Sequence, residues 1–273
     1  MRNPIAISSG DPCGVGPEIS VKAWKKLKNE LTFVLYTSFS FMRNLFPDVP
    51  FIKVDTPHEA NNIMQNALPI FDIPFSGKPF VGEANNKFAK ETILSIELAT
   101  ASCLSGQSRA LCTNPINKYN LKSNAGFEFS GHTDFLKYLT SSKNATMMLV
   151  SKKLKVVPAT IHLSLFEAIK LINKDLINST ILSCHNSLIN QFKIPNPKIF
   201  VSGLNPHAGE NGLFGMEEIN VISPVIVELR KTGIDVNGPF SADSLFHPKI
   251  RNRYDAVICM YHDQALIPIK TLS

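Results

Sequence analysis

The sequence predicts an α/β fold with a largely parallel sheet. Short apolar runs alternate along the chain with longer amphipathic segments, which is the order expected when a crossover helix follows each strand. The short runs are continuously apolar, which is typical of strands that are buried on both faces. The chain has 273 residues, of which 44% are hydrophobic and 18% charged. This length is sufficient for a large core that divides into two lobes.

Seven short apolar runs predict the buried strands of this fold. In chain order they are PIAIS (4–8), TFVLYTS (32–38), RALCT (109–113), TMMLVS (146–151), VVPATIHL (156–163), KIFVSGL (198–204) and DAVICMY (255–261).

Four longer segments have the apolar spacing of helices. Pro17 suits a first helical turn, where its missing N–H breaks no hydrogen bond. Pro224 is expected to kink or divide the last helix. In chain order the segments are PEISVKAWKKLK (17–28), KFAKETILSIELATASCLS (87–105), KDLINSTILSCHNSLINQF (174–192) and MEEINVISPVIVELRK (216–231).

Composition narrows the class of protein. The sequence contains no run of about 18 apolar residues, the length that a membrane-spanning helix needs. The N-terminus also lacks the apolar region of a signal peptide, so we expect a cytoplasmic location. The five cysteines have no C-x-x-C spacing, which favours buried thiols over a zinc site or disulfides. The net charge is +6, but the basic residues are dispersed. We therefore expect no nucleic-acid partner, whereas small anionic substrates remain compatible.

Polar residues follow the predicted strands at their carboxyl ends, where open α/β sheets bind ligands. His162 lies near the end of one strand, while His207 and His262 come directly after two others. A neutral imidazole is the commonest metal ligand, and three of them leave a divalent ion open positions for substrate oxygens. Each histidine taken alone also fits a hydrogen-bonded core residue, so both interpretations stay open on the residues alone.

Two loops invite an anion-binding interpretation. GDPCGVGPE has the spacing G-x-x-x-G-x-G, which matches neither the Rossmann nor the Walker motif, so a tight strand-to-helix turn is favoured. In SGHTDFLKYL (130–139), a helix is expected to begin near Thr133, which fits an N-cap. Alternatively, His132 and Thr133 together could bind a phosphate or a carboxylate, and this interpretation fits the residues as well as the N-cap does. Glu217 and Glu218 suit the start of a helix by their charge, and no chemistry is expected of them.

Six segments together resemble the signature of the PdxA family, the 4-hydroxythreonine-4-phosphate dehydrogenases of pyridoxine biosynthesis. They occur in that family's order from Gly10 to Lys270. The resemblance implies the fold of isocitrate and isopropylmalate dehydrogenases, with two α/β/α lobes and a cleft between them. We expect an N-terminal lobe at 1–130, completed by chain beyond 273, and a second lobe at 131–273. The segments are GDPCGVGPE, NPINK, SGHTDFL, NPHAGENGLFG, GPFSADSLF and YDAVICMYHDQALIPIK.

The same resemblance implies roles for individual residues. The family's metal-binding histidines match His162, His207 and His262, the three that strand position also indicates. Its substrate-binding residues match His132, Thr133 and Lys270. The implied cofactors are NAD or NADP and a divalent ion, either zinc, magnesium or cobalt, and the cofactor-binding residues are unassigned. The family's active site lies at a homodimer interface, so a homodimer is expected.

The implied reaction is NAD-dependent oxidation of 4-phosphooxy-L-threonine at C3. Decarboxylation then gives 3-amino-2-oxopropyl phosphate. A divalent cation would polarise the substrate oxygens, while His132, Thr133 and Lys270 would bind the phosphate. Asp243 and Asp263 are candidates for proton transfer or for orienting a ligand histidine, and the sequence does not choose between these roles.

Three alternative functions and two departures from the family accompany this interpretation. The alternatives are a dehydrogenase of threonate or erythronate 4-phosphate, a metal-dependent phosphatase, and a ligand-binding protein without catalysis.

Members of the family continue past IPIK with further substrate contacts, among them an asparagine and an arginine, whereas this sequence ends at TLS. Cys13 stands where the family usually has alanine.

Overall fold

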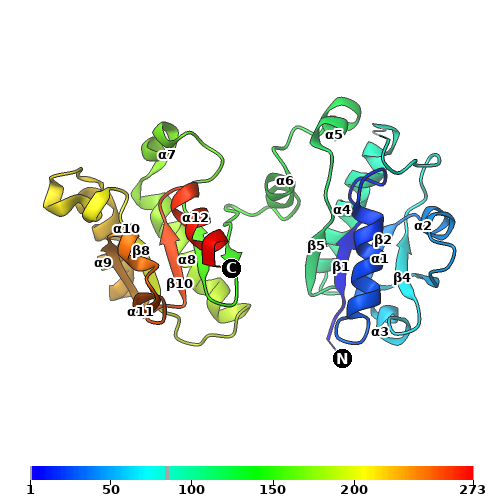
Figure 1. The fold of residues 1–273 in the computed structure, drawn as a ribbon, viewed down its shortest axis with the longest axis horizontal. Helices are drawn as coiled ribbons and strands as arrows, with labels where there is room; N and C mark the ends of the chain where they lie inside the picture. Colours follow the sequence, from blue (N-terminus) through cyan, green and yellow to red (C-terminus); the bar gives the residue numbers. More distant parts are fainter. Residues whose placement is uncertain (1, 84–85, 273) are drawn as a thin grey trace. The chain divides into compact units, whose positions relative to one another are not determined.

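The computed structural model describes residues 2–83 and 86–272. These residues divide into two compact units, Met1–Ala145 and Thr146–Ser273, and each unit contains one five-stranded sheet (Figure 1). The predicted α/β class is confirmed. The division falls after Ala145, later than the boundary expected after residue 130. The reason is that helix α6 (His132–Leu139) packs against α4 (Ala89–Leu104) of the first unit through Phe135 and Ile96.

The sheet of the first unit is entirely parallel, with strand order β3-β4-β2-β1-β5. β1 lies near the centre because it pairs with both β2 and β5. Its alternate side chains point to opposite faces, as the two-residue period of a strand requires. The strands are β1 (Ile5–Ser8), β2 (Phe33–Thr37), β3 (Phe51–Val54), β4 (Leu68–Asp72) and β5 (Ala110–Thr113).

Helices cover both faces of the first sheet. On one face Ile7 and Leu35 pack with Trp24 of the first helix, and on the other Ala6 and Val34 pack with residues of α4. The first unit therefore has α/β/α layers. Besides α4 and α6, its helices are α1 (Gly16–Leu27), α2 (Phe39–Leu45), α3 (Ala60–Ile63) and α5 (Lys118–Ala125), with 3-10 turns η1 (Pro57–Glu59) and η2 (Asn86–Phe88).

The second sheet has the order β6-β7-β10-β8-β9, and only its edge strand β6 is antiparallel among the described strands. β10, β7 and β8 are neighbours in this order, although they are far apart in the sequence. The carboxyl ends of these three strands consequently meet at one edge of the sheet. The strands are β6 (Leu149–Val150), β7 (Lys155–Pro158), β8 (Ile199–Ser202), β9 (Val236–Phe240) and β10 (Ala256–Cys259).

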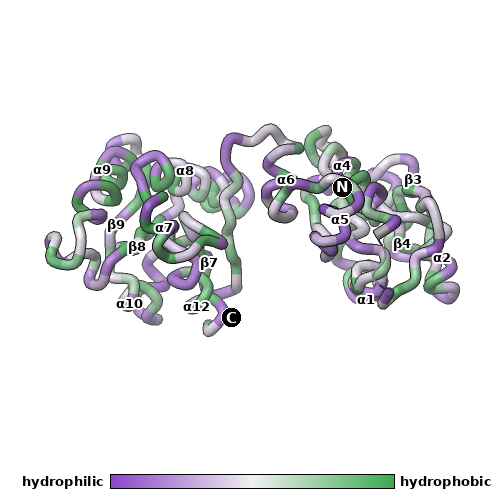
Figure 2. Tube along the Cα trace, turned by 90° about the horizontal axis from the view of Figure 1, so that it is seen from above, coloured by the Kyte–Doolittle hydropathy of each residue, from purple (hydrophilic) through white to green (hydrophobic). Residues whose placement is uncertain are grey.

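The second sheet is also covered on both faces. Helices α8 and α9 pack on Val157 and Ile258, while α12 packs on Val156 and Val257. Along helices such as α9 the hydropathy alternates between hydrophobic and hydrophilic residues, as expected for one buried face (Figure 2). The helices are α7 (Leu165–Leu171), α8 (Lys174–Asn190), α9 (Ser223–Lys231), α10 (Ala242–Leu245), α11 (Pro248–Arg251) and α12 (His262–Leu272), with η3 (Pro206–Gly212) and the π-helical turn η4 (Glu218–Ile222).

All seven predicted strands are present, although β7 ends at Pro158, well before the expected residue 163. The predicted helix at 216–231 is divided as expected, because α9 begins at Ser223 with Pro224 in its first turn and η4 precedes it. Three further strands were not predicted: β3, β4 and β9. No helix within the described residues is both long and apolar enough to cross a membrane.

Candidate functional site

The three candidate metal ligands follow three neighbouring parallel strands of the second unit. His162 lies four residues after the last residue of β7, His262 is the first residue of α12 after β10, and His207 is the second residue of η3 after β8. Because these strands are parallel and adjacent, all three histidines lie at the same edge of the sheet. The strand-end argument made from the sequence thus matches the observed topology.

His162 and His262 lie side by side. Their ring centroids are 5.7 Å apart, and both rings line a cavity of about 210 Å³. The segments that lead to the two histidines are joined by a hydrogen bond, because the buried Thr160 hydroxyl donates to the carbonyl of Met260 at 2.8 Å. Two imidazoles that share one tetrahedral ion have centroids about 5 Å apart, given a metal–nitrogen distance of about 2.1 Å. This pair therefore fits a shared metal ion.

Asp263 contacts the imidazole of His262. One carboxylate oxygen lies 2.7 Å from Nδ1 of His262. An Nδ1–H that donates to a carboxylate leaves Nε2 with the lone pair that a metal needs. Of the two roles open for Asp263, the structure thus supports the orienting one.

His207 is held in an unusual backbone conformation. Residues His207 to Asn211 all have positive φ, at 52°, 50°, 81°, 43° and 55°. His162 is also left-handed, with φ of 51°. Side chains with a Cβ rarely adopt this region, and such strain is concentrated at functional sites. Two of the three candidate ligands therefore lie on strained backbone.

The histidines do not yet form a complete cluster. Within residues 2–83 and 86–272, no three His, Cys, Asp or Glu side chains are close enough together to hold one metal ion. The structure brings His162 and His262 together and places His207 on the neighbouring loop, where its ring lies 6.2 Å from that of Phe214.

Glu218 is a structural residue of this loop that sequence reasoning missed. It is only 2% exposed, and its carboxylate accepts hydrogen bonds from the backbone N–H of Asn205 at 2.7 Å and from the side-chain amide of Asn205 at 3.0 Å. It also packs against Gly209, where an added Cβ would lie 2.7 Å from Oε2. Its spacing of four residues before the apolar Ile222 was the available signal for burial.

Gln264 connects two of the strand ends and was also missed. Its carbonyl oxygen accepts from the Ser202 hydroxyl at 2.6 Å and from the backbone N–H of Met260 at 2.7 Å. Its amide donates to the carbonyl of Gly203 at 2.9 Å. One side chain thus fixes the end of β8, which leads to His207, against the end of β10, which leads to His262.

Asp243 lies at the start of α10 and is exposed. A hydrogen bond from the Ser241 hydroxyl is the main cause that lowers the pKa of Asp243, and the charge of His207 contributes to the same direction. Helix α10, which carries this carboxylate, contacts the η3 loop. Asp243 is therefore ionised at neutral pH.

The candidate substrate residues lie on different units. His132 and Thr133 open α6 in the first unit, whereas Lys270 is exposed on α12 of the second. Burial is the main cause that lowers the pKa of His132, and the Lys118 ammonium adds to it. Nε2 of His132 is buried without a hydrogen-bond partner. Because α6 begins at His132, its N-cap residue is Gly131 and not Thr133 as the sequence suggested. Gly131 has no side chain, and no side chain caps this helix.

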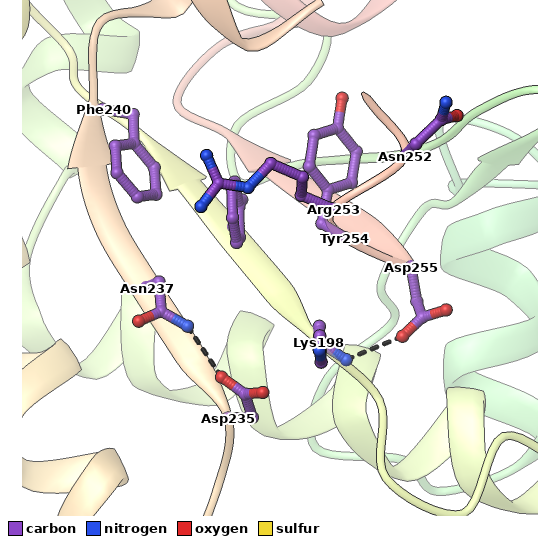
Figure 3. Close-up of a pocket in the computed structure, with 9 residues that line it drawn as sticks. Lys198, Asp235, Asn237, Phe240, Asn252, Arg253, Tyr254 and Asp255 are labelled. Atoms are coloured by element: carbon purple, nitrogen blue, oxygen red, sulfur yellow. Dashed lines mark hydrogen bonds between the residues drawn. The ribbon is translucent and has the colours of Figure 1, made fainter. Parts of the chain in front are cut away.

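A larger cavity of about 680 Å³ opens elsewhere on the second unit (Figure 3). Three of its residues immediately precede β8, β9 and β10, at the opposite ends of the strands from the histidines. None of the candidate site residues lines it. Because α/β sheets bind ligands beyond their carboxyl ends, the histidines rather than this cavity stay the candidate functional site. The lining residues are Lys198, Phe200, Asp235, Asn237, Phe240, Asn252, Arg253, Tyr254 and Asp255.

Comparison with known proteins identifies the family of this chain. The family model described as "Pyridoxal phosphate biosynthetic protein PdxA" matches residues 29–273. The chain belongs to the PdxA family. A relative from Ruegeria sp. (strain TM1040), named 4-hydroxythreonine-4-phosphate dehydrogenase, is 44% identical over 268 residues, which are 98% of this chain and 81% of the relative. The family resemblance inferred from the motifs is thereby confirmed.

Solved structures of PdxA-like proteins share the fold. The 4-hydroxythreonine-4-phosphate dehydrogenase of Klebsiella pneumoniae superposes with a TM-score of 0.89 at 34% identity, covering 99% of this chain and 85% of that one. A terephthalate 1,2-cis-dihydrodiol dehydrogenase from Burkholderia xenovorans LB400 superposes with a TM-score of 0.75 at 27% identity, covering 99% and 83%. The same architecture is thus found in dehydrogenases named for different substrates.

Proposed function

We propose that this PdxA-family chain is an oxidoreductase that oxidises 4-phosphooxy-L-threonine at C3 with NAD. Decarboxylation follows and yields 3-amino-2-oxopropyl phosphate for pyridoxal 5'-phosphate synthesis. The observation that carries the proposal is the placement of His162, His207 and His262 at the carboxyl ends of three adjacent parallel strands. Membership of a family whose relatives are named for this dehydrogenase supports it.

His162, His207 and His262 would hold a divalent ion. The spacing of the His162 and His262 rings supports a shared ion, and His207 on the adjacent loop would complete the set if this loop moved toward the pair. Imidazole suits zinc or cobalt, whereas magnesium prefers oxygen ligands, so we favour zinc or cobalt. When bound, the ion supplies Lewis-acid polarisation of the substrate oxygens, and NAD or NADP supplies the hydride acceptor.

The remaining residues bind substrate and handle protons. His132, Thr133 and Lys270 bind the phosphate through hydroxyl, imidazole and ammonium donors. Asp263 fixes the ring of His262 through Nδ1. Asp243 is ionised and lies near His207, so its carboxylate is our candidate to accept the proton of the substrate hydroxyl.

The chain would act as a cytoplasmic homodimer with the active site at the subunit interface, as its family resemblance implies. Sedimentation velocity of the purified protein checks the dimer. A monomer with full dehydrogenase activity would contradict an active site that both subunits complete.

The test of the proposed activity follows NADH absorbance and free phosphate together. The protein is given NAD, zinc, cobalt or magnesium, and in turn 4-phosphooxy-L-threonine, erythronate 4-phosphate, threonate 4-phosphate or unphosphorylated 4-hydroxythreonine. We expect NADH with the first substrate. Phosphate release without NADH would instead identify a phosphatase, and NADH confined to the sugar acids would assign the chain to the related dehydrogenases.

A His207→Ala variant tests the metal assignment. We expect bound metal and NADH formation to be lost while the unfolding midpoint of the metal-free protein stays unchanged, because the side chain is exposed. Metal content by mass spectrometry and circular dichroism give these readouts. His247→Ala is the matched control, since that histidine is exposed and lies outside the candidate cluster. Unchanged metal content in His207→Ala would refute the ligand role.

A further inference from the structure

Lys118 lies beside the candidate substrate residues of the first unit. It is the first residue of α5, and its side chain reaches the residue before α6. A Cβ added at Gly131 would lie 3.4 Å from Nζ of Lys118 and 3.3 Å from its Cε. The ammonium is therefore placed at the N-terminus of the helix that begins with His132 and Thr133. All these residues belong to the same compact unit.

The polar groups around this ammonium are available to a ligand. Among the residues that the structure describes, Lys118 has no ion-pair partner. Nε2 of His132 is buried without a partner, and no side chain caps the N-terminus of α6. The carboxylate of Asp134 accepts a hydrogen bond from the Ser130 hydroxyl and forms no ion pair with Lys118. Lys118 and Thr133 are exposed, so a ligand can reach them.

The electrostatics of this arrangement favour an anion. The N-terminus of a helix carries partial positive charge, and the Lys118 ammonium, at the first position of α5, lies beside the start of α6, so this place attracts anions. Asp134 in the first turn of α6 contributes one negative charge there but forms no ion pair with Lys118. Burial and Lys118 lower the pKa of His132, so its imidazole is neutral at neutral pH. The full positive charge of this group of residues consequently comes from Lys118.

We propose that Lys118 is a further substrate-binding residue, which binds the phosphate of the substrate together with His132 and Thr133. The identity of the substrate rests on the proposed function, whereas the anion site itself rests on the geometry of the first unit. An ammonium, a hydroxyl and the free N–H groups of a helix N-terminus match the oxygens of a phosphate monoester dianion. Lys118 supplies the charge compensation that the two neighbouring side chains lack.

The first arm of the test measures phosphate binding without catalysis. Inorganic phosphate is titrated into the full chain by calorimetry, for the unchanged protein, Lys118→Gln and the control Lys122→Gln. Lys122 is exposed on the same helix one turn later. We expect Lys118→Gln to weaken phosphate binding at least about tenfold, as the loss of one charge-assisted hydrogen bond predicts, and Lys122→Gln to leave it unchanged. Equal affinities for the two variants would overturn the proposal.

The second arm measures substrate discrimination. In Lys118→Gln we expect KM for 4-phosphooxy-L-threonine to rise at least about tenfold, while kinetic constants for unphosphorylated 4-hydroxythreonine stay unchanged. A general loss of structure would impair both substrates equally and would count against the proposal. Lys118→Arg keeps the charge and is expected to retain most of the phosphate affinity. A loss as large as that of Lys118→Gln would contradict the role of charge.

The two proposals fail in different ways. If the unchanged protein forms no NADH from any substrate, the proposed dehydrogenase function is wrong, and the phosphate titration still decides the role of Lys118. If NADH forms normally but Lys118→Gln behaves like Lys122→Gln in both arms, only the role of Lys118 is wrong.

Discussion

Single side chains at the candidate site are held by partners that the sequence does not reveal. Asp263 is one example, because its carboxylate lies 2.7 Å from Nδ1 of His262, a contact that in our proposal would favour the tautomer that binds a metal through Nε2. The sequence indicated Asp243 and Asp263 as candidates, but for each it left two roles open, proton transfer and the orientation of a ligand histidine. Support for the proposed orienting role of Asp263 comes only from the contact, since adjacency in the chain does not determine where a side chain points.

The orienting role of Asp263 predicts a graded loss of metal affinity. Asp263→Asn is expected to lower zinc affinity about 10–100-fold, the range typical when a partner of a ligand histidine is changed. Competition with a fluorescent zinc chelator measures this. Asp48→Asn is the control because Asp48 is exposed in the first unit. An affinity equal to that of the control would exclude the orienting role.

Glu218 is a second residue whose partners the sequence does not reveal. Its position near a helix start suggested only a favourable charge, whereas its buried carboxylate binds Asn205 at the base of the His207 loop. Glu218→Ala would leave the partly buried N–H of Asn205 without its acceptor. We expect the free energy of unfolding to fall by about 2–3 kcal/mol in chemical denaturation. Glu228→Ala, on an exposed position of α9, should change it little; equal effects would show that the buried bonds contribute nothing.

At the scale of elements, the left-handed η3 turn has the most demanding geometry. Gly209 has φ of 81°, and an added Cβ would meet Oε2 of Glu218 at 2.7 Å. Gly233 also has positive φ, at 92°, but an added Cβ there meets nothing within 4 Å. Comparing the two glycines separates steric overlap from backbone strain.

Gly209→Ala should therefore destabilise the protein more than Gly233→Ala. Adoption of the left-handed region by alanine costs about 1–2 kcal/mol at either position. Overlap with Glu218 should add about 1–3 kcal/mol at Gly209 only. Urea denaturation of both variants checks the difference, and equal destabilisation would mean that Glu218 yields freely to the new methyl group.

The elements that the sequence predicted share a strong hydrophobic pattern, and those it missed do not. The β1, β2 and β8 runs are continuously apolar, and all three strands are present. β3 has exposed Ile52 and Lys53, which weakens its pattern. β4 contains a proline, and β9 contains both glycine and proline, residues that usually interrupt strands. These strands form because neighbouring strands pair with them, which local sequence does not encode.

At the scale of the whole molecule, the candidate ligand residues are distributed over both units. The phosphate residues His132 and Thr133 belong to the first unit, and the histidines of the metal site belong to the second. Strand order made the second set predictable, because three strand-end histidines share one edge only in a parallel sheet. The first set, His132 and Thr133, was recognisable only by family resemblance. Lys118 was not recognised, because its proximity to Gly131 arises only in the folded unit.

This distribution predicts two separate patterns of ligand protection in hydrogen exchange. Inorganic phosphate should slow amide exchange in α5 and α6, and zinc should slow it in the loops after β7, β8 and β10. Zinc should act without phosphate, because all three histidines lie within the second unit, and phosphate should slow exchange in α5 and α6 without zinc, because Lys118, His132 and Thr133 lie within the first. Zinc protection that appears only in the first unit would contradict the assignment of the histidines.

The left-handed run from His207 to Asn211 also affects how saturation mutagenesis of this chain would be interpreted. Ala208 has φ of 50°, a region that β-branched side chains avoid. Valine, isoleucine and threonine would be rejected there whether or not the position has any chemical role. If most substitutions at these five positions abolish function, the cause can be the left-handed backbone alone. Asparagine and glycine adopt this conformation readily, so their effect at each position would separate the backbone requirement from a role in metal binding.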